Sequence, residues 1–315
     1  MRRALLIGLD EYPDAPLNGC VQDAERMRDV LERNEDGSIN FDCRVLECPP
    51  TIVSRASLRQ AITELFSQPA DIAWLHFSGH GTANDLGGYL VTPDFEANDV
   101  GVPMMDVLTM ANNADISETI ITLDCCNSGA FGQIPATNAN NLNLSDGIAV
   151  ITATRASEPS LEVGGGGIFS SLLVEALEGG AAGIQGEVTI AGIYAFIDSA
   201  LGPWDQRPLF KANISRLVQL RKGKEKVSQD LLRRIVELFP LPAEDLPLDP
   251  SYEPSVEPRH AQHEDDFRAL QLLRAGGLVE PVNEEHMFYA SVNSDACRLT
   301  SSGLYYWRLV NDGRI

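Results

Sequence analysis

Two apolar segments, each running directly into a polar turn punctuated by Gly, constrain this chain most strongly. The first is WLHFSGHG at 74–81, and the second is TLDCCNSG at 122–129. Such runs are typical of buried strands, and the turns after them present a His and a Cys. A thiol and an imidazole on neighbouring strand ends are the parts of a cysteine nucleophile and its base. If the two strands are adjacent in one parallel sheet, the sequence predicts a thiol hydrolase.

The N-terminal two thirds of the chain alternates between strand and helix patterns. Strands are predicted at 4–8, 44–48, 72–78, 119–124, 148–154 and 209–214. Helices are predicted at 23–34, 57–67, 103–111, 168–177 and 190–200. The alternation predicts an α/β fold, with about six mainly parallel strands and helices on both faces. Ligands bind such sheets at the carboxyl ends of the strands, where both motifs are expected.

Charge and cysteine usage exclude several classes of protein. The net charge of -21 argues against general affinity for nucleic acid or anionic membranes. No stretch reaches the length of a membrane span, and the opening MRRALLIGLD is interpreted as a strand and not as a signal peptide. The six cysteines lack metal-binding or disulfide-scaffold spacing. We therefore expect a cytoplasmic protein with reduced thiols and neither nucleic-acid nor membrane partners.

The basic hexamer RKGKEK at 221–226 predicts a linker between domains at 1–220 and 227–315. The second domain is expected to contain helices at 231–239, 265–275 and 302–310, an irregular connection at 240–258, and a hairpin of strands at 287–292 and 296–300. This order predicts a winged-helix-like domain. From Lys224 onward, 10 Lys and Arg face 16 Asp and Glu, which disfavours DNA and favours a protein partner.

Strand alternation indicates which cysteine is the nucleophile. Successive side chains point to opposite sides of a strand, so Asp124 and Cys126 share a side that Cys125 does not. The same rule groups His80 with Ser78. Cys126 and His80 are therefore the pair predicted to meet, while Cys125 packs beneath the sheet. The alternative for any single cysteine is a small buried hydrophobe.

SGHG at 78–81 and DCCNSG at 124–129 resemble the His and Cys motifs of the caspase-like cysteine peptidases. The opening ALLIGLDEYPDAPLNGCVQDAERM at 4–27 also resembles that family, and the likeness extends over about residues 1–220. It is nearer to metacaspases and their bacterial relatives, because the Arg-Gly and the QAC-type Cys motif of animal caspases are absent. The resemblance implies the caspase-hemoglobinase fold.

The resemblance also implies roles for individual residues. Cys126 would attack the scissile carbonyl, and His80 would protonate the leaving amine. The backbone N–H groups of Cys126 and Gly81 would form the oxyanion hole, where one donor is typically worth ~3 kcal/mol. The family implies no obligatory third catalytic member.

In metacaspases, two Asp residues line the pocket for the residue before the cut, and here they correspond to Asp23 and Asp124. Two carboxylates favour a cation, so cleavage is expected after Arg, then Lys, and not after Asp. Ser78 matches a pocket Ser of the family. The alternatives are a helix N-cap for Asp23, a carboxylate that bonds a loop N–H for Asp124, and a role only in the turn for Ser78.

No cofactor is predicted, with calcium as the open alternative, because metacaspases often bind it through Asp clusters. Asp94, Glu96 and Asp99 are predicted in a loop after the His motif, but their spacing does not fit an EF-hand. A solvated acidic loop is the favoured interpretation of these three residues.

The sequence therefore predicts a cysteine endopeptidase acting on proteins with exposed Arg or Lys. Analogy with bacterial relatives suggests a regulated stress, cell-death or antiphage defence protease, whose tail binds a protein partner. The alternatives are a non-catalytic adaptor and a separase-like or legumain-like peptidase. The linker is expected to be exposed, so self-cleavage at 221–226 would separate the two domains and activate a zymogen.

Overall fold

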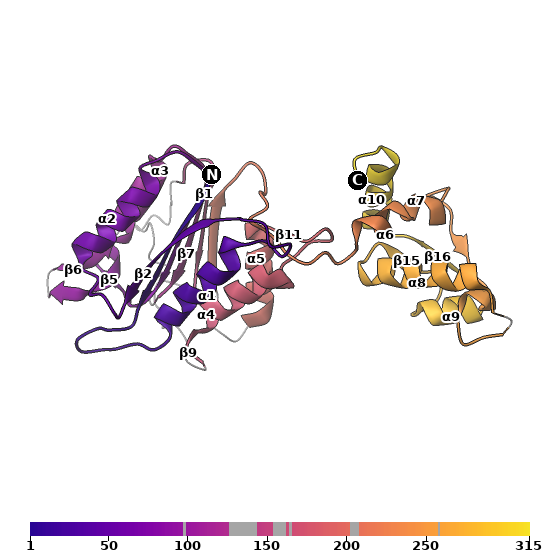
Figure 1. The fold of residues 1–315 in the computed structure, drawn as a ribbon, viewed down its shortest axis with the longest axis horizontal. Helices are drawn as coiled ribbons and strands as arrows, with labels where there is room; N and C mark the ends of the chain where they lie inside the picture. The colour runs from indigo at the N-terminus through magenta and orange to yellow at the C-terminus, as the bar shows by residue number, and fades with distance from the viewer. Residues whose placement is uncertain (97–98, 126–143, 154–161, 164–165, 202–207, 258) are drawn as a thin grey trace. The chain divides into compact units, whose positions relative to one another are not determined.

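The structure is a computed structural model that describes residues 1–96, 99–125, 144–153, 162–163, 166–201, 208–257 and 259–315. It divides into two compact units (Figure 1). Unit 1 comprises Met1–Ala182 and Glu187–Lys224, and unit 2 comprises Gly183–Gly186 and Glu225–Ile315. No described helix is both long and apolar enough to cross a membrane.

A six-stranded sheet forms the centre of unit 1, in the order β12-β8-β7-β3-β1-β2. Its strands are β1 (Arg2–Leu9), β2 (Asp42–Cys48), β3 (Ala70–Ser78), β7 (Ile116–Asp124), β8 (Ile148–Thr152) and β12 (Leu209–Asn213). Every pairing is parallel except that of β12 with β8. The mainly parallel six-stranded sheet is confirmed.

Helices cover both faces of this sheet, as Figure 1 shows. One face packs against α1 (Cys20–Glu32), α4 (Ile168–Glu175), the π-helix η3 (Ala176–Gly180) and α5 (Ile190–Leu201). The other packs against α2 (Arg55–Phe66) and α3 (Met104–Asn112). Alternation along β3 feeds both cores, because Trp74 belongs to the α1 side and Leu75 to the α2 side. The central strands are therefore mostly apolar, as in other sheets covered on both faces, whereas the edge strands β2 and β12 carry charged residues.

A second, three-stranded antiparallel sheet follows the His motif and was not predicted. It consists of β4 (Gly81–Asn84), β5 (Gly87–Glu96) and β6 (Asp99–Pro103). The prediction that Asp94, Glu96 and Asp99 lie in a loop is wrong, since they occupy the paired ends of β5 and β6. These strand ends are exposed or half-buried, so their sequence carries no apolar run.

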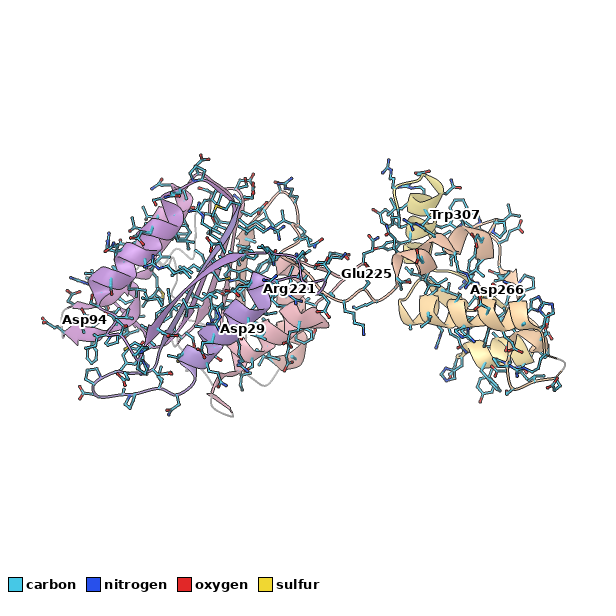
Figure 2. The ribbon with its side chains drawn as sticks, in the orientation of Figure 1. Asp29, Asp94, Arg221, Glu225, Asp266 and Trp307 are labelled. Carbon is cyan, nitrogen blue, oxygen red and sulfur yellow. The ribbon has the colours of Figure 1, made fainter. Side chains whose placement is uncertain are left out.

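Two short strand pairs complete the description of unit 1. β9 (Glu162–Val163) pairs with β10 (Gly166–Gly167), and β11 (Glu187–Val188) pairs with β13 (Arg221–Lys222). The segment predicted as a linker therefore begins inside unit 1. The expectation that it is exposed is wrong for Arg221, which is 7% exposed and labelled in Figure 2.

Unit 2 has its own core and a small antiparallel sheet in the order β14-β16-β15. Its strands are β14 (Leu246–Pro247), β15 (Val279–Pro281) and β16 (Ala296–Leu299). Its helices are α6 (Gln229–Arg233), α7 (Ile235–Leu238), the 3-10 turn η4 (Pro250–Tyr252), α8 (Ala261–Ala275), α9 (Met287–Val292) and α10 (Ser301–Asn311). On α10, the indole N–H of Trp307 (Figure 2) donates to the carbonyl of Phe239 at 2.7 Å.

The predicted hairpin in unit 2 is wrong. Met287–Val292 is the helix α9, and β16 pairs with β14 and β15 instead. Met287, Ala290 and Ser291 are buried, which is the i, i+3, i+4 spacing of a helix face and not the period of a strand. The winged-helix character of this unit stays a prediction.

Candidate functional site

The two predicted motifs follow neighbouring parallel strands, β3 and β7. Ser78 and Asp124 are direct partners in the register, and the Gly79 N–H donates to the Asp124 carbonyl at 3.2 Å. His80 comes two residues after Ser78. Cys126, the predicted nucleophile, lies outside the described residues. Its neighbour Cys125 is 1% exposed in the core beside α2 and α3, which confirms the prediction that it packs beneath the sheet.

Tyr12 fixes the backbone and the ring of His80. The His80 N–H donates to the Tyr12 hydroxyl at 3.0 Å, and that hydroxyl donates to the Val91 carbonyl at 3.3 Å. The two rings meet edge to face, with their centroids 4.5 Å apart. A side chain at Gly79 would place its Cβ 2.7 Å from the Tyr12 hydroxyl, so the glycine of the motif makes room for this contact.

A backbone carbonyl sets the proton position on His80. The Nε2 atom of His80 lies 2.7 Å from the carbonyl oxygen of Ala15, which can only accept a hydrogen bond. Nε2 therefore carries the ring proton, and in neutral His80 the Nδ1 atom holds the lone pair. An imidazole oriented in this way can take a proton at Nδ1 and return it.

Asp23 is fully buried on the first turns of α1 and is held by three donors. Its Oδ2 accepts from the Gly167 N–H at 3.1 Å and from the Ser78 hydroxyl at 3.2 Å. Its Oδ1 accepts from Arg26 at 2.9 Å. Asp23 is the fourth residue of α1, whose first N–H groups bond to Asp10 instead. The alternative that Asp23 is the N-cap is therefore wrong.

Asp124 is 4% exposed and faces the first turn of α4. Its Oδ2 accepts from the Ser170 N–H at 3.1 Å and from the Ser170 hydroxyl at 2.7 Å. Asp124 does therefore bond a backbone N–H, as its alternative interpretation expected. Gly167 separates the two carboxylates, because a Cβ there would lie 2.0 Å from Asp124 Oδ2 while its N–H binds Asp23.

The N-terminus of α4 thus receives both carboxylates, and the partial positive charge of a helix N-terminus favours anions. Burial raises the pKa of Asp23, and so does the neighbouring Asp124, while the Gly167 N–H and Arg26 act in the opposite direction, so that the net pKa is about 6. Two buried acids therefore flank one glycine at this helix end, and Arg26 bonds one of them.

The remaining predicted residues take other positions. Gly81 opens β4 directly after His80 and pairs with Leu90. Asp94 accepts from the Arg55 N–H at the start of α2, and Asp99 forms an ion pair with the Arg55 side chain. Among the described residues no group of three or more His, Cys, Asp or Glu could hold a metal ion.

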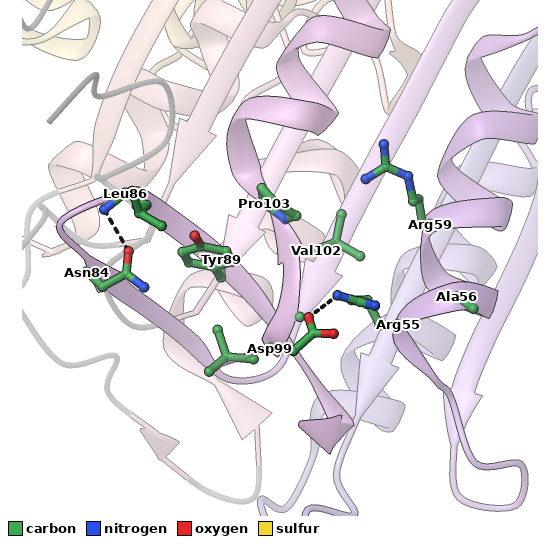
Figure 3. Close-up of a pocket in the computed structure, with 11 residues that line it drawn as sticks. Arg55, Ala56, Arg59, Asn84, Leu86, Tyr89, Asp99, Val102 and Pro103 are labelled. Atoms are coloured by element: carbon green, nitrogen blue, oxygen red, sulfur yellow. Dashed lines mark hydrogen bonds and ion pairs between the residues drawn. The ribbon is translucent and has the colours of Figure 1, made fainter. Parts of the chain in front are cut away.

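A cavity of about 750 Å³ lies between α2 and the β4-β5-β6 sheet (Figure 3). Arg55 and Arg59 line it, but Arg55 is paired with Asp99 and Arg59 with Asp106. Asp99 lines it, but the described lining contains no Cys, Ser or Thr and none of Asp23, Ser78, His80, Gly81 and Asp124. We therefore assign no catalytic role to this cavity.

Sequence reasoning missed the residues that support this site: Tyr12, the Ala15 carbonyl, Arg26 and Ser170. Tyr12 stands in the EYP turn after the first strand, where a single buried aromatic side chain has no periodic signal. Ser170 lies inside an apolar helix pattern, and only the tertiary fold brings its hydroxyl to Asp124.

Comparisons with known proteins agree with this geometry. Residues 1–226 match the caspase domain family of peptidases, C14. Metacaspase-1 of Eremothecium gossypii is 31% identical over 153 residues, which cover 42% of this chain and 33% of that protein. Metacaspase-3 of Trypanosoma cruzi is 26% identical over 168 residues, which cover 47% of this chain and 46% of that protein. The matched region thus spans between a third and a half of these curated relatives.

A solved structure shows the shared fold. Protein GSU0716 from Geobacter sulfurreducens superposes with a TM-score of 0.52 and 18% sequence identity. The match covers 71% of this chain and 97% of that chain.

Proposed function

Because this chain belongs to the caspase domain family of cysteine peptidases, we propose that unit 1 hydrolyses peptide bonds through a Cys126–His80 dyad and cuts after Arg, then Lys. The observation that carries the specificity is the pair of buried carboxylates, Asp23 and Asp124, at the N-terminus of α4. The register supports the dyad, since Ser78 and Asp124 pair two residues before His80 and Cys126.

The chemistry requires one proton to move twice. The Cys126 thiol gives its proton to the lone pair of His80 Nδ1, and the thiolate sulfur bonds to the carbonyl carbon of the substrate. The carbonyl oxygen becomes an oxyanion, which the N–H groups of Gly81 and Cys126 would stabilise. The imidazolium returns the proton to the leaving amine as the C–N bond breaks. Water then hydrolyses the thioester by the same route.

His80 suits this task because one contact orients its ring and another holds its main chain. The Ala15 carbonyl orients the ring through Nε2–H and stabilises the imidazolium, since that bond is stronger when the ring is charged. Tyr12 holds the main chain of His80 in place. No additional acidic residue is needed to select the tautomer.

Arg is the favoured side chain before the cut because a planar guanidinium can bond two carboxylates with several N–H groups at once. Lys presents a compact charge and is expected to be second. An Asp substrate would bring a third negative charge beside Asp23 and Asp124, which is repulsive.

We further propose that unit 2 binds a protein partner, in a cytoplasmic stress, cell-death or defence context. Of the basic residues in 221–226, Lys224 and Lys226 are exposed, whereas Arg221 is buried. Self-cleavage that separates the units would therefore occur after Lys224 or Lys226.

The test uses purified full-length protein and fluorogenic peptides that differ only in the residue before the cut: Arg, Lys, Asn and Asp. The Arg peptide should be cleaved fastest, and Cys126→Ala should reduce its hydrolysis by at least about 1000-fold. An Arg-based electrophilic peptide should label the wild type at position 126. Cys125→Ala is the matched control, and it should still be labelled. Unlabelled wild-type protein would instead support a non-catalytic adaptor, and preference for Asn would support a legumain-like enzyme.

A further inference from the structure

We propose that His76 and Ser170 are positioning residues that hold the Asp124 carboxylate ionised and fixed, through a directional chain of hydrogen bonds that begins at Trp74. The inference rests on the proposed function, because Asp124 is the residue expected to select a cationic substrate side chain. Neither His76 nor Ser170 has a role in the dyad.

Four hydrogen bonds link five buried side chains in series. Trp74 Nε1 lies 2.9 Å from Thr122 Oγ1, which lies 3.0 Å from His76 Nδ1. His76 Nε2 lies 3.4 Å from Ser170 Oγ, which lies 2.7 Å from Asp124 Oδ2. The first four side chains are fully buried, and Asp124 is 4% exposed. The chain runs beneath the carboxyl ends of β3 and β7 and ends at α4.

The two ends of the chain determine its direction. The Trp74 indole N–H can only donate, and an ionised Asp124 carboxylate can only accept. The single hydroxyl proton of Ser170 therefore points to Asp124, so the Ser170 oxygen must accept from His76. At the other end, the Thr122 oxygen accepts from Trp74.

The imidazole of His76 must then carry its proton on Nε2. Burial lowers the pKa of His76 to about 3, so the ring is neutral at neutral pH and has one N–H. With that proton donated to Ser170, Nδ1 accepts the hydroxyl proton of Thr122 at 3.0 Å. The Leu75 carbonyl is the other acceptor near this hydroxyl, at the longer distance of 3.4 Å. Each group then has a donor or acceptor that matches it.

A neutral Asp124 would reverse every bond beyond Thr122. A protonated carboxyl would donate to Ser170, Ser170 would donate to His76 Nε2, and His76 would carry its proton on Nδ1. The tautomer of a histidine that never touches substrate therefore reports the charge of Asp124. This link separates the proposal from simple core packing, in which either tautomer would serve.

The hydrogen-bond chain stabilises the charge of buried Asp124 in the way that water stabilises the charge of an exposed acid. A buried carboxylate is costly unless donors stabilise its charge, and hydrogen bonds to a charged acceptor are the strong ones. Donors aligned in one direction also polarise each other. The chain thus keeps Asp124 anionic inside the protein, where an arriving guanidinium would meet it.

The kinetic test compares two peptides, one with Arg and one with citrulline, its neutral isostere, before the cut. Ser170→Ala removes the hydroxyl donor but keeps the backbone N–H that also bonds Asp124. We expect the ratio of kcat/KM for Arg over citrulline to fall by about 10- to 100-fold, because hydrogen bonds to charged groups have this strength. A purely structural role would lower both rates equally, and an unchanged ratio would overturn the proposal.

Thr92→Val is the matched control. Its hydroxyl is buried, and among the described residues it has no hydrogen-bond partner. This variant should leave the ratio unchanged. His76 offers a second pair of variants: His76→Phe should lower the ratio, while His76→Gln retains an N–H near the ε position and should restore part of it. Equal Arg over citrulline ratios in these two variants would also contradict the proposed hydrogen-bond chain.

A measurement on the wild type does not depend on activity. Nitrogen-15 NMR of the His76 ring at neutral pH should show the Nε2–H tautomer, and in Ser170→Ala that preference should weaken. An Nδ1–H tautomer or an imidazolium in the wild type would overturn the proposal even if Arg peptides are cleaved. Conversely, wild-type protein that cleaves no Arg peptide would refute the proposed function while the tautomer remained as expected.

Discussion

Unit 1 contains two pairs of carboxylates, and each pair contacts an arginine residue in different surroundings. Asp94 and Asp99 lie at the ends of β5 and β6, near solvent, and bond the backbone and side chain of Arg55. Asp23 and Asp124 lie buried at the start of α4 and are bonded by backbone N–H groups and hydroxyls. The side chain of Arg26 bonds Asp23 of the buried pair.

The two pairs differ in burial and not in the number of acids, so the proposed preference for a cation depends on burial. Water screens the exposed pair, so each contact there contributes little to stability. The buried pair is poorly screened, and its charges raise the attraction for a guanidinium as well as the cost of having none.

Substitution of Asp124 in the buried pair should change kcat/KM more than any other variant below. Asp124→Asn should lower kcat/KM for the Arg peptide at least about 30-fold, because removing one partner of a buried charge pair costs 2 kcal/mol or more. The citrulline peptide should be affected far less. Steady-state kinetics with both peptides measures this, and an equal loss on both would show that Asp124 supports the fold and not the charge preference.

The effect of pH on the preference for Arg over citrulline tests the charge of Asp23. Since the pKa of Asp23 is raised to about 6, its negative charge is lost as pH falls through that value. We expect the Arg over citrulline ratio to fall below pH 6, and the use of a ratio cancels titration of the dyad. In Asp23→Asn this step in the ratio should disappear. A step that persists in the variant would assign it to another group.

The same shift has a consequence for stability. The folded-state pKa lies above the ordinary value of 3.8, so the folded state binds the proton more tightly. Ionisation of Asp23 therefore destabilises the protein as pH rises from about 4 to 6. Urea unfolding should show Asp23→Asn gaining stability relative to wild type over this interval, by at most about 3 kcal/mol, since one pKa unit corresponds to about 1.4 kcal/mol.

The smallest effect belongs to the exposed pair. Asp94→Ala removes the acceptor for the first N–H of α2 and should cost about 1 kcal/mol of unfolding free energy. Asp99→Asn breaks an exposed ion pair and should cost less than about 1 kcal/mol. Neither variant should change the Arg over citrulline ratio. A change of threefold or more would mean that this surface communicates with the buried site.

The sequence predicted the parallel sheet because its central strands are buried on both faces and therefore read as mostly apolar runs. Ile72 to Phe77 is such a run, interrupted only by His76. It did not predict β4-β5-β6, where exposed positions such as Asp94 and Glu96 interrupt the pattern. α9 was mistaken for a strand, because six residues of mixed polarity fit both periods until the partners of Met287 and Ala290 are known.

Some parts of the candidate site could likewise be predicted from the sequence, and others could not. Strand alternation was sufficient to place Cys125 in the core. It grouped Ser78 with His80 and Asp124 with Cys126, whereas the pairing of Ser78 with Asp124 comes from the register of the structure. The pairing of Asp23 with Asp124 came from family resemblance, since 100 residues separate them in the sequence. The contact of Ser170 with His76 arises only from the packing of α4 on β3, which no local pattern encodes.

The hydrogen bonds of Arg221 set the C-terminal limit of a stable unit 1. Its guanidinium donates to the carbonyls of Val30, Arg33 and Leu177 at 2.8–3.0 Å, which closes the ends of α1 and of the helix after α4. A positive charge at these carbonyls complements the helix dipoles. A recombinant fragment that stops at residue 220 would lose these hydrogen bonds and leave the three carbonyls without this donor. The smallest stable form of unit 1 should therefore include the first half of the basic hexamer.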